Sequence, residues 1–305
     1  MSTCKTLAAA AAALALSLTA SISLAQLPEH LRDYPLAARS SKGESVAPFF
    51  NGWIKNDDGS VTMIFGFANQ NREAVVDVPL GANNFIEPAE FDGAQPTHFP
   101  IYNRGGFRGI SERGAFAITV PAEQADTEVV WTLSSNGETW SVPGRATSSA
   151  YEMSREPRAL GSLAPAIRFD LDGAESNDQE GIYAAPVAAK VGQPVTLSAY
   201  IRDRGEREQY PENEMLLYPL GTEWIMHQGP AAPEFEPGHI SGRERAEMGA
   251  EGTVDGWTPV QTQATFWEPG NYVVRLRVDN FTAPDSGFDY VCCWSNAYVP
   301  VTVSP

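Results

Sequence analysis

Cysteine is scarce in this 305-residue sequence, and two of its three cysteines, Cys292 and Cys293, are adjacent. The third, Cys4, lies near the N-terminus. An adjacent pair cannot tie distant strands of one chain together, so a framework of disulfides is excluded as the source of stability. The fold must therefore be stabilised by hydrophobic cores.

The motifs of the common enzyme classes are also missing. There is no Gly-x-Ser-x-Gly elbow, no His-Glu-x-x-His metal motif, no Walker loop and no dinucleotide fingerprint. Only four histidines occur, and they are widely spaced. We therefore predict that the protein is not an enzyme.

Basic residues are few, with 21 Lys and Arg against 38 Asp and Glu, for a net charge of −17. Such a chain repels nucleic-acid phosphates and anionic lipid, which argues against both as partners. The same charge also serves simply to keep a secreted protein soluble.

The N-terminus has the pattern of a signal peptide. Lys5 precedes an Ala/Leu run from Leu7 to Leu18, and Ser23-Leu24-Ala25 forms a small-x-small cleavage site. The apolar run is too short to span a bilayer, and no later stretch is apolar enough to do so. We expect residues 1–25 to be removed and the protein to be secreted or periplasmic, with a retained N-terminal anchor as the alternative.

Short alternating runs separated by turn residues predict an all-β chain of two immunoglobulin-like sandwiches. We expect an N-terminal arm or edge strand over 26–48, a first sandwich over 49–145, a linker over 146–165 and a second sandwich over 166–305. In the first sandwich, Asn56-Asp-Asp-Gly59 predicts a hairpin turn. Further strands are expected at 74–80, 114–120, 128–133 and 139–142, with a long loop over 83–113.

In the second sandwich, the stretch from Thr265 to Asp279 predicts the last hairpin. Pro269 and Gly270 form its turn, and apolar residues alternate from Tyr272 onward. Other strands are expected around 166–169, 195–201, 222–227, 260–267 and 296–303. The segment 227–256 is expected to be an insertion.

Three segments of the second half resemble the immunoglobulin-like domains of the polycystic-kidney-disease (PKD) type found in bacterial secreted proteins. They are Val191 to Ala199, Trp224 with His227 to Pro230, and Ala264 to Val278. The resemblance implies that Trp224 packs in the core and that the Tyr272 hydroxyl reaches an upstream backbone group, as in a tyrosine corner. The whole chain is similar to uncharacterised bacterial secreted proteins with a Cys-Cys-Trp ending, and that similarity brings no activity with it.

The adjacent cysteines are the most unusual candidate site. As a vicinal disulfide they would stiffen the loop before the last strand. Alternatively, beside Phe288, Tyr290 and Trp294, they would form a surface on which a sugar or another flat ligand stacks. Pairing between chains, or binding of a soft metal by the reduced thiols, are further alternatives.

Two loops are weaker candidates. The acidic loop 170–180 offers Asp170, Asp172, Asp178 and Glu180 as calcium ligands, but its spacing departs from the helix-loop-helix calcium pattern, and a solvated loop is the alternative. The long loop of the first sandwich carries His98, Tyr102 and Arg104 among aromatics, a composition that suits carbohydrate binding. The alternative is that this loop folds over the sandwich with its aromatics buried.

Together these features predict a non-catalytic binding protein outside the cytoplasm that recognises a glycan or an envelope protein and needs no cofactor unless calcium is bound. The alternatives are a structural module of an envelope assembly, or a metal or redox accessory protein that uses Cys292 and Cys293.

Overall fold

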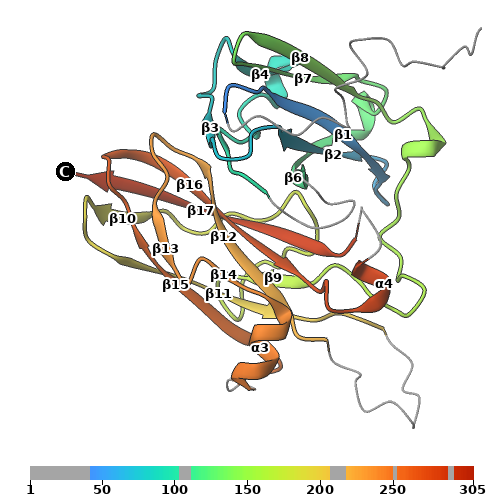
Figure 1. Cartoon of the computed structure of the whole chain (residues 1–305). Helices are drawn as coiled ribbons and strands as arrows, with labels where there is room; N and C mark the ends of the chain where they lie inside the picture. Colours follow the sequence, from blue (N-terminus) through green and yellow to red (C-terminus); the bar gives the residue numbers. More distant parts are fainter. Residues whose placement is uncertain (1–41, 103–110, 207–217, 250–252, 288–291) are drawn as a thin grey trace, which may run out of the picture. The chain divides into compact units, whose positions relative to one another are not determined.

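The computed structural model describes residues 42–102, 111–206, 218–249, 253–287 and 292–305 (Figure 1). These residues all belong to one compact unit that spans 40–305. The predicted signal peptide and most of the predicted arm lie outside the described residues. Within the described residues, no helix has both the length and the apolar character needed to cross a membrane.

The first sandwich is built from two three-stranded antiparallel sheets. One sheet has the order β1-β2-β6, with β1 at Val46–Lys55, β2 at Val61–Asn69 and β6 at Ser111–Val120. The other has the order β4-β7-β8, with β4 at Asn84–Glu87, β7 at Val129–Ser135 and β8 at Glu138–Gly144. Two short strands, β3 (Val76–Asp77) and β5 (His98–Phe99), pair with each other.

Aromatic side chains fill the core of this first sandwich. Phe65, Phe116 and Trp131 pack together from β2, β6 and β7, with ring centroids 5.0 Å apart between Phe116 and Trp131. The predicted turn between β1 and β2 is confirmed, since the backbone of Asn56 bonds Ser60 and Gly59 has a positive φ of 86°. The first strand begins at Val46, inside the stretch 26–48 for which an arm or an edge strand is expected.

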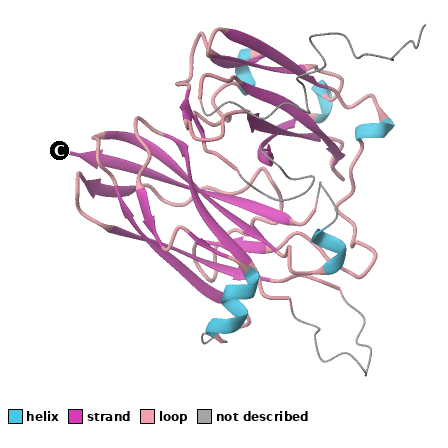
Figure 2. Cartoon of the chain, in the orientation of Figure 1, coloured by secondary structure: helices cyan, strands magenta, loops and turns pink. Residues whose placement is uncertain are grey.

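The second sandwich is larger. Its first sheet has the order β10-β17-β16-β12-β14, where the strands are β10 (Val187–Lys190), β17 (Trp294–Ser304), β16 (Gly270–Asp279), β12 (Gly221–Gln228) and β14 (His239–Ile240). Its second sheet has the order β13-β15-β11-β9, where the strands are β13 (Glu234–Glu236), β15 (Thr258–Thr265), β11 (Val195–Arg202) and β9 (Ala166–Arg168). The all-β sandwich class predicted from the sequence is therefore confirmed (Figure 2).

Alternation of side chains explains how the second sandwich buries its core. In β11, Leu197, Ala199 and Ile201 are buried, while Thr196 and Ser198 between them are exposed. Trp224 lies in the same core, as the PKD resemblance implied. The Tyr272 hydroxyl donates to the backbone oxygen of Glu268, 2.8 Å away, which is the upstream contact that the resemblance implied.

The predicted last hairpin is wrong in one respect. The turn at Pro269 and Gly270 joins β15 to β16, but these strands lie in different sheets and do not pair. β16 pairs instead with β17 and β12. The turn therefore carries the chain from one layer to the other, which local turn chemistry cannot distinguish from a hairpin.

Helices are short and sit in the connections. They are the 3-10 turns η1 (Ala89–Phe91), η3 (Ala122–Gln124) and η4 (Ser149–Tyr151), and the α-helices α3 (Gly242–Met248) and α4 (Pro284–Gly287). Helix α3 begins with a capping box, in which Ser241 and Glu244 bond each other's backbone N–H. It lies in the segment expected to be an insertion, which also contains β13 and β14.

A buried ion cluster joins the two sandwiches. Glu112 in β6 accepts hydrogen bonds from Arg275 and Arg277 in β16, and its side chain is fully buried. Burial works against the charge of Arg277, but the carboxylates of Glu112, Glu223 and Asp279 outweigh it and raise the pKa of that guanidinium. A buried charge without a partner is strongly destabilising. The carboxylate of the first sandwich and the guanidinium groups of the second therefore favour contact between the two sandwiches.

Candidate functional site

The candidate site lies where one strand of the second sandwich changes sheets. β13 pairs with β15 only over Glu234↔Thr265 to Glu236↔Gln263. The chain then turns at Pro237 and pairs with β12 of the opposite sheet as β14. Among the described strands, only β11 pairs with residues 258–262 of β15, so the other edge of that stretch is open.

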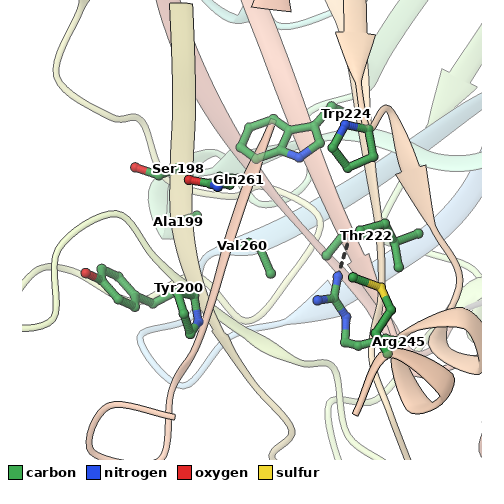
Figure 3. Close-up of a pocket in the computed structure, with 12 residues that line it drawn as sticks. Ser198, Ala199, Tyr200, Thr222, Trp224, Arg245, Val260 and Gln261 are labelled. Atoms are coloured by element: carbon green, nitrogen blue, oxygen red, sulfur yellow. Dashed lines mark hydrogen bonds between the residues drawn. The ribbon is translucent and has the colours of Figure 1, made fainter. Parts of the chain in front are cut away.

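A groove of about 470 Å³ follows this open edge. It is lined by Pro259 to Gln261 of β15 and by Trp224 and Ile240 of the opposite sheet. Figure 3 shows Val260 and Gln261 together with Trp224. A second hollow of about 350 Å³ continues past Thr258 and shares Arg245 and Met248 with the first. The two hollows together form one groove, called here the β15 groove.

Helix α3 forms one wall of the β15 groove. Arg245 is fixed there, because its Nε donates to the carbonyl of Leu220 and its Nη2 donates to the Thr222 hydroxyl, both at 2.8 Å (Figure 3). Met248, in the last turn of the helix, lines both hollows and remains 56% exposed. Helix α3 is therefore anchored through Arg245, and it presents the apolar side chain of Met248 to the groove.

Acidic side chains flank the groove. Glu234 and Glu236 on β13 are exposed at one end of the open edge, and Glu244 and Glu247 are exposed on α3. Hydrogen bonds from Ser241 lower the pKa of Glu244, so this carboxylate is charged at neutral pH. The groove thus combines an open strand edge and apolar walls, with the exposed carboxylates of Glu234 and Glu236 at one end.

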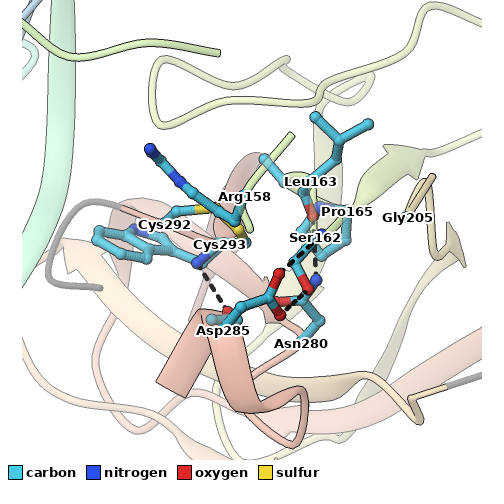
Figure 4. The surroundings of a disulfide bond; sticks show 12 residues. Arg158, Ser162, Leu163, Pro165, Gly205, Asn280, Asp285, Cys292 and Cys293 are labelled. Atoms are coloured by element: carbon cyan, nitrogen blue, oxygen red, sulfur yellow. Dashed lines mark hydrogen bonds between the residues drawn. A yellow bond between two sulfur atoms is a disulfide. The ribbon is translucent and has the colours of Figure 1, made fainter. Parts of the chain in front are cut away.

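Cys292 and Cys293 form a disulfide with each other and are both buried (Figure 4). The backbone N–H of Cys293 donates to the Ser286 hydroxyl at 3.0 Å, and its carbonyl accepts from the backbone of Asn280. This burial fits the expectation of a bond that holds the loop before β17. Cys292 also lines a hollow of about 190 Å³, and the stacking of a ligand there stays a prediction.

The aromatic neighbours expected around the cysteines divide into two groups. Phe288 and Tyr290 lie outside the described residues. Trp294 is buried, and its Nε1 lies 3.5 Å from the carbonyl of Gly114 in β6 of the first sandwich. Trp294 therefore packs between the sandwiches and is not available to a ligand.

The long loop of the first sandwich is folded inward. Tyr102 is buried in the core, and His98 is buried with its Nδ1 donating to Asp77 at 2.6 Å. Asn84 and Gln95 bond the loop backbone from within. The third expected residue, Arg104, lies outside the described residues. The described part of this loop follows the alternative reading, a cover over the sandwich.

Two of the four expected calcium ligands, Asp178 and Glu180, make other contacts through their carboxylates. Asp178 accepts from the backbone of Glu180 and Gly181 and pairs with Arg155, and Glu180 accepts from the Thr119 hydroxyl at 2.6 Å. The carbonyl of Asp170 closes a turn to Gly173. Within the described parts of the chain, no three His, Cys, Asp or Glu side chains gather where they could hold a metal ion. The fourth expected ligand, Asp172, is exposed in the same loop.

The sequence alone does not reveal the β15 groove, because β13, β14 and α3 lie in residues 227–256, which are expected to be an insertion. Two signals were present: Ser241 with Glu244 predicts a helix start, and Glu236-Pro237 breaks a strand. Neither signal indicates that the strand changes sheets, since that depends on the partner strands.

Comparison with known proteins adds little about function. In the D0-D1 domain of intimin, the match covers 84% of this chain and 97% of the intimin chain, with 10% sequence identity and a TM-score of 0.24. In a protein of unknown function from Porphyromonas gingivalis W83, it covers 85% of this chain and 98% of that chain, with 10% sequence identity and a TM-score of 0.20. A titin A168-169 structure matches 85% and 100% at 12% identity and 0.21. No protein-family model matches the sequence, and no curated protein matches it. TM-scores this low do not establish a shared fold, so the fold class is assigned from the strand pairing.

Proposed function

We propose that the protein is a non-catalytic binding protein of the cell envelope or exterior, and that it holds a protein partner in the β15 groove. The observation that carries the proposal is the open edge of β15 beside apolar walls on a fixed support. An open sheet edge beside pockets for alternate side chains is a recurring site at which proteins bind an extended segment of a partner. The signal-peptide pattern at residues 1–25 supports the location outside the cytoplasm.

The groove favours a protein over a glycan as the partner. Glycan sites present exposed aromatic faces beside amides, whereas in this groove Trp224 is buried and Tyr200 is half-buried. A peptide chain, in contrast, offers both backbone groups for the open strand edge and apolar side chains for the walls.

Site-specific photo-crosslinking in the cells that make the protein tests this function. A photoreactive benzoyl-phenylalanine replaces Met248 in the groove, and in a control it replaces Leu160, which is similarly exposed at 52% but lies outside the groove. We expect a protein adduct at position 248 and none at position 160. Absence of an adduct at position 248, or the same adducts at both positions, would overturn the proposal.

A further inference from the structure

We propose that an extended, net-basic segment of a partner protein adds to the second sandwich as a new strand, pairing with residues 258–262 of β15. This inference rests on the proposed function and names the partner's chemistry and its mode of binding. The segment would continue the line of β13, antiparallel to β15, beyond the point where β13 leaves the sheet at Glu236.

The backbone of β15 has one paired edge and one open edge. β15 runs from Thr258 to Thr265, and β11 pairs with it over 258–264 on one side. On the other side β13 ends opposite Gln263. A strand whose edge is open presents unpaired N–H and C=O groups, which are a template for another chain.

Pro259 indicates which backbone groups face the open edge. Proline has no N–H, so within a sheet its nitrogen faces away from the paired neighbour. In an extended strand, alternate residues point their backbone groups to the same side, so Gln261 and Gln263 share the direction of Pro259. Gln263 lies opposite Glu236 of β13. The N–H and C=O of Gln261 are therefore the next pair available to an added strand.

The groove beside this edge accounts for the side chains of the added strand. Successive side chains of a strand point to opposite faces, so every second one would enter the groove. There it would meet Trp224, Ile240 and Met248, which are apolar. The remaining side chains would face solvent beside the exposed Ser198 and Gln261. The walls thus select an alternation of apolar and polar residues.

Charge selects a basic segment over a second copy of this chain. The exposed carboxylates of Glu234 and Glu236 stand where the segment would meet β13. On α3, the carboxylates of Glu244 and Glu247 are balanced by the guanidinium groups of Arg243 and Arg245. The whole chain carries −17, so two copies repel each other while a Lys-rich or Arg-rich segment is attracted.

The test uses the chain from residue 26 and an acetylated, amidated octapeptide of alternating Lys and Val, with binding followed by the anisotropy of a fluorophore on the peptide. Gln261→Pro removes the N–H that the added strand needs, at an edge where no described strand pairs. Gln261→Ala removes the same side chain and keeps that N–H. We expect the proline variant to bind at least about tenfold more weakly and the alanine variant to bind as the wild type does.

Two N-methylated peptides supply an independent readout that does not depend on the variant's folding. One is methylated at all lysines and the other at all valines, so each blocks the N–H groups of one edge. Strand addition predicts that one isomer loses binding and the other retains it. Equal binding of both isomers, or equal binding to the two Gln261 variants, would overturn strand addition.

The outcomes separate this inference from the proposed function. An octapeptide that does not bind overturns the basic strand, yet an adduct at position 248 still supports a partner in the groove. A wild-type dimer that Gln261→Pro disrupts, as measured by sedimentation, assigns the edge to a second copy and also overturns the basic segment.

Discussion

The carboxylate of Glu112 in β6 and the guanidinium of Arg275 in β16 form a buried ion pair, with 2.6 Å between Oε1 and Nη2. The two residues belong to different sandwiches and lie 163 positions apart in the chain. Arg275 also donates to the backbone oxygen of Ala115, in the same strand as Glu112, and Arg277 donates to both carboxylate oxygens. This buried ion cluster is therefore centred on one carboxylate, while His227 and Gln228 of β12 bond the backbone of the first sandwich elsewhere.

Glu112→Gln is expected to destabilise the protein by about 3–5 kcal/mol, because it leaves two buried guanidinium groups without the opposing charge. Urea unfolding of the chain from residue 26 measures the change. Glu128→Gln is the matched control, since Glu128 pairs with Arg145 at an exposed position and its loss costs about 1 kcal/mol or less. Similar effects of the two substitutions would contradict the role assigned to Glu112.

Gly114→Ala is expected to strain the same interface. A Cβ at this position would lie 2.6 Å from Cζ2 of Trp294, and the residue has a positive φ of 56°. Gly137→Ala separates these two costs, because its φ is also positive, at 84°, but nothing lies within 4 Å of the added carbon. We expect the Gly114 variant to lose about 1–3 kcal/mol more than the Gly137 variant in urea unfolding. Equal losses would mean that Trp294 moves aside.

His227 is expected to make the protein less stable in mild acid. Burial, followed by the positive charge of Arg275, lowers the pKa of this imidazole from 6.5 to about 3, and its Nε2 donates to the carbonyl of Ala94 at 2.8 Å. The folded state therefore keeps His227 neutral while the unfolded chain takes up a proton below pH 6.5. Its contribution to stability is complete above pH 6.5 and is lost as the pH falls from there toward 3.

The measurement compares the free energy of unfolding at pH 7.5 and 5.5. Wild type should lose about 1.4 kcal/mol more over this range than His227→Gln, because glutamine does not titrate. His239→Gln, which removes an exposed histidine, is the matched control. A His227→Gln curve that parallels the wild type would show that His227 is not held neutral.

The cysteine pair is expected to be oxidised and protected in the native protein. Cys292 and Cys293 are bonded to each other and buried, so the chain from residue 26 should weigh two hydrogens less than its reduced form and should resist iodoacetamide while folded. Mass spectrometry before and after denaturing reduction measures both properties. Alkylation of either cysteine in the folded, unreduced protein would contradict this expectation.

Most of the fold could be predicted from the sequence, because period-two alternation and turn residues are local signals. β11 and the turn at Asn56 to Gly59 were found in this way. The strand at residues 74–80 was overestimated, since only Val76 and Asp77 pair. The segment 83–113, expected to be a loop, contains more strand than the sequence suggests, because β4, β5 and the start of β6 lie within it.

The candidate site could not be predicted, because it depends on pairings between distant residues. The glutamates and proline of Glu234 to Pro237 appear in the sequence as a polar loop, and only the register with β15 and β12 shows that a strand changes sheets there. Aromatic residues, in contrast, suggested a binding surface at positions that are buried. Tyr102 and Trp294 suited a binding surface by composition, but each fills a buried space.

The ion cluster between β6 and β16 also limits how this chain can change over generations. If Glu112 is replaced while Arg275 and Arg277 stay, the buried cations remain uncompensated, and the reverse change buries a lone carboxylate. Positions 112, 275 and 277 are therefore expected to be inherited as a set and replaced together. For the same reason, recombination that exchanges one sandwich for an unrelated one is disfavoured, and the two are expected to pass through evolution as one module.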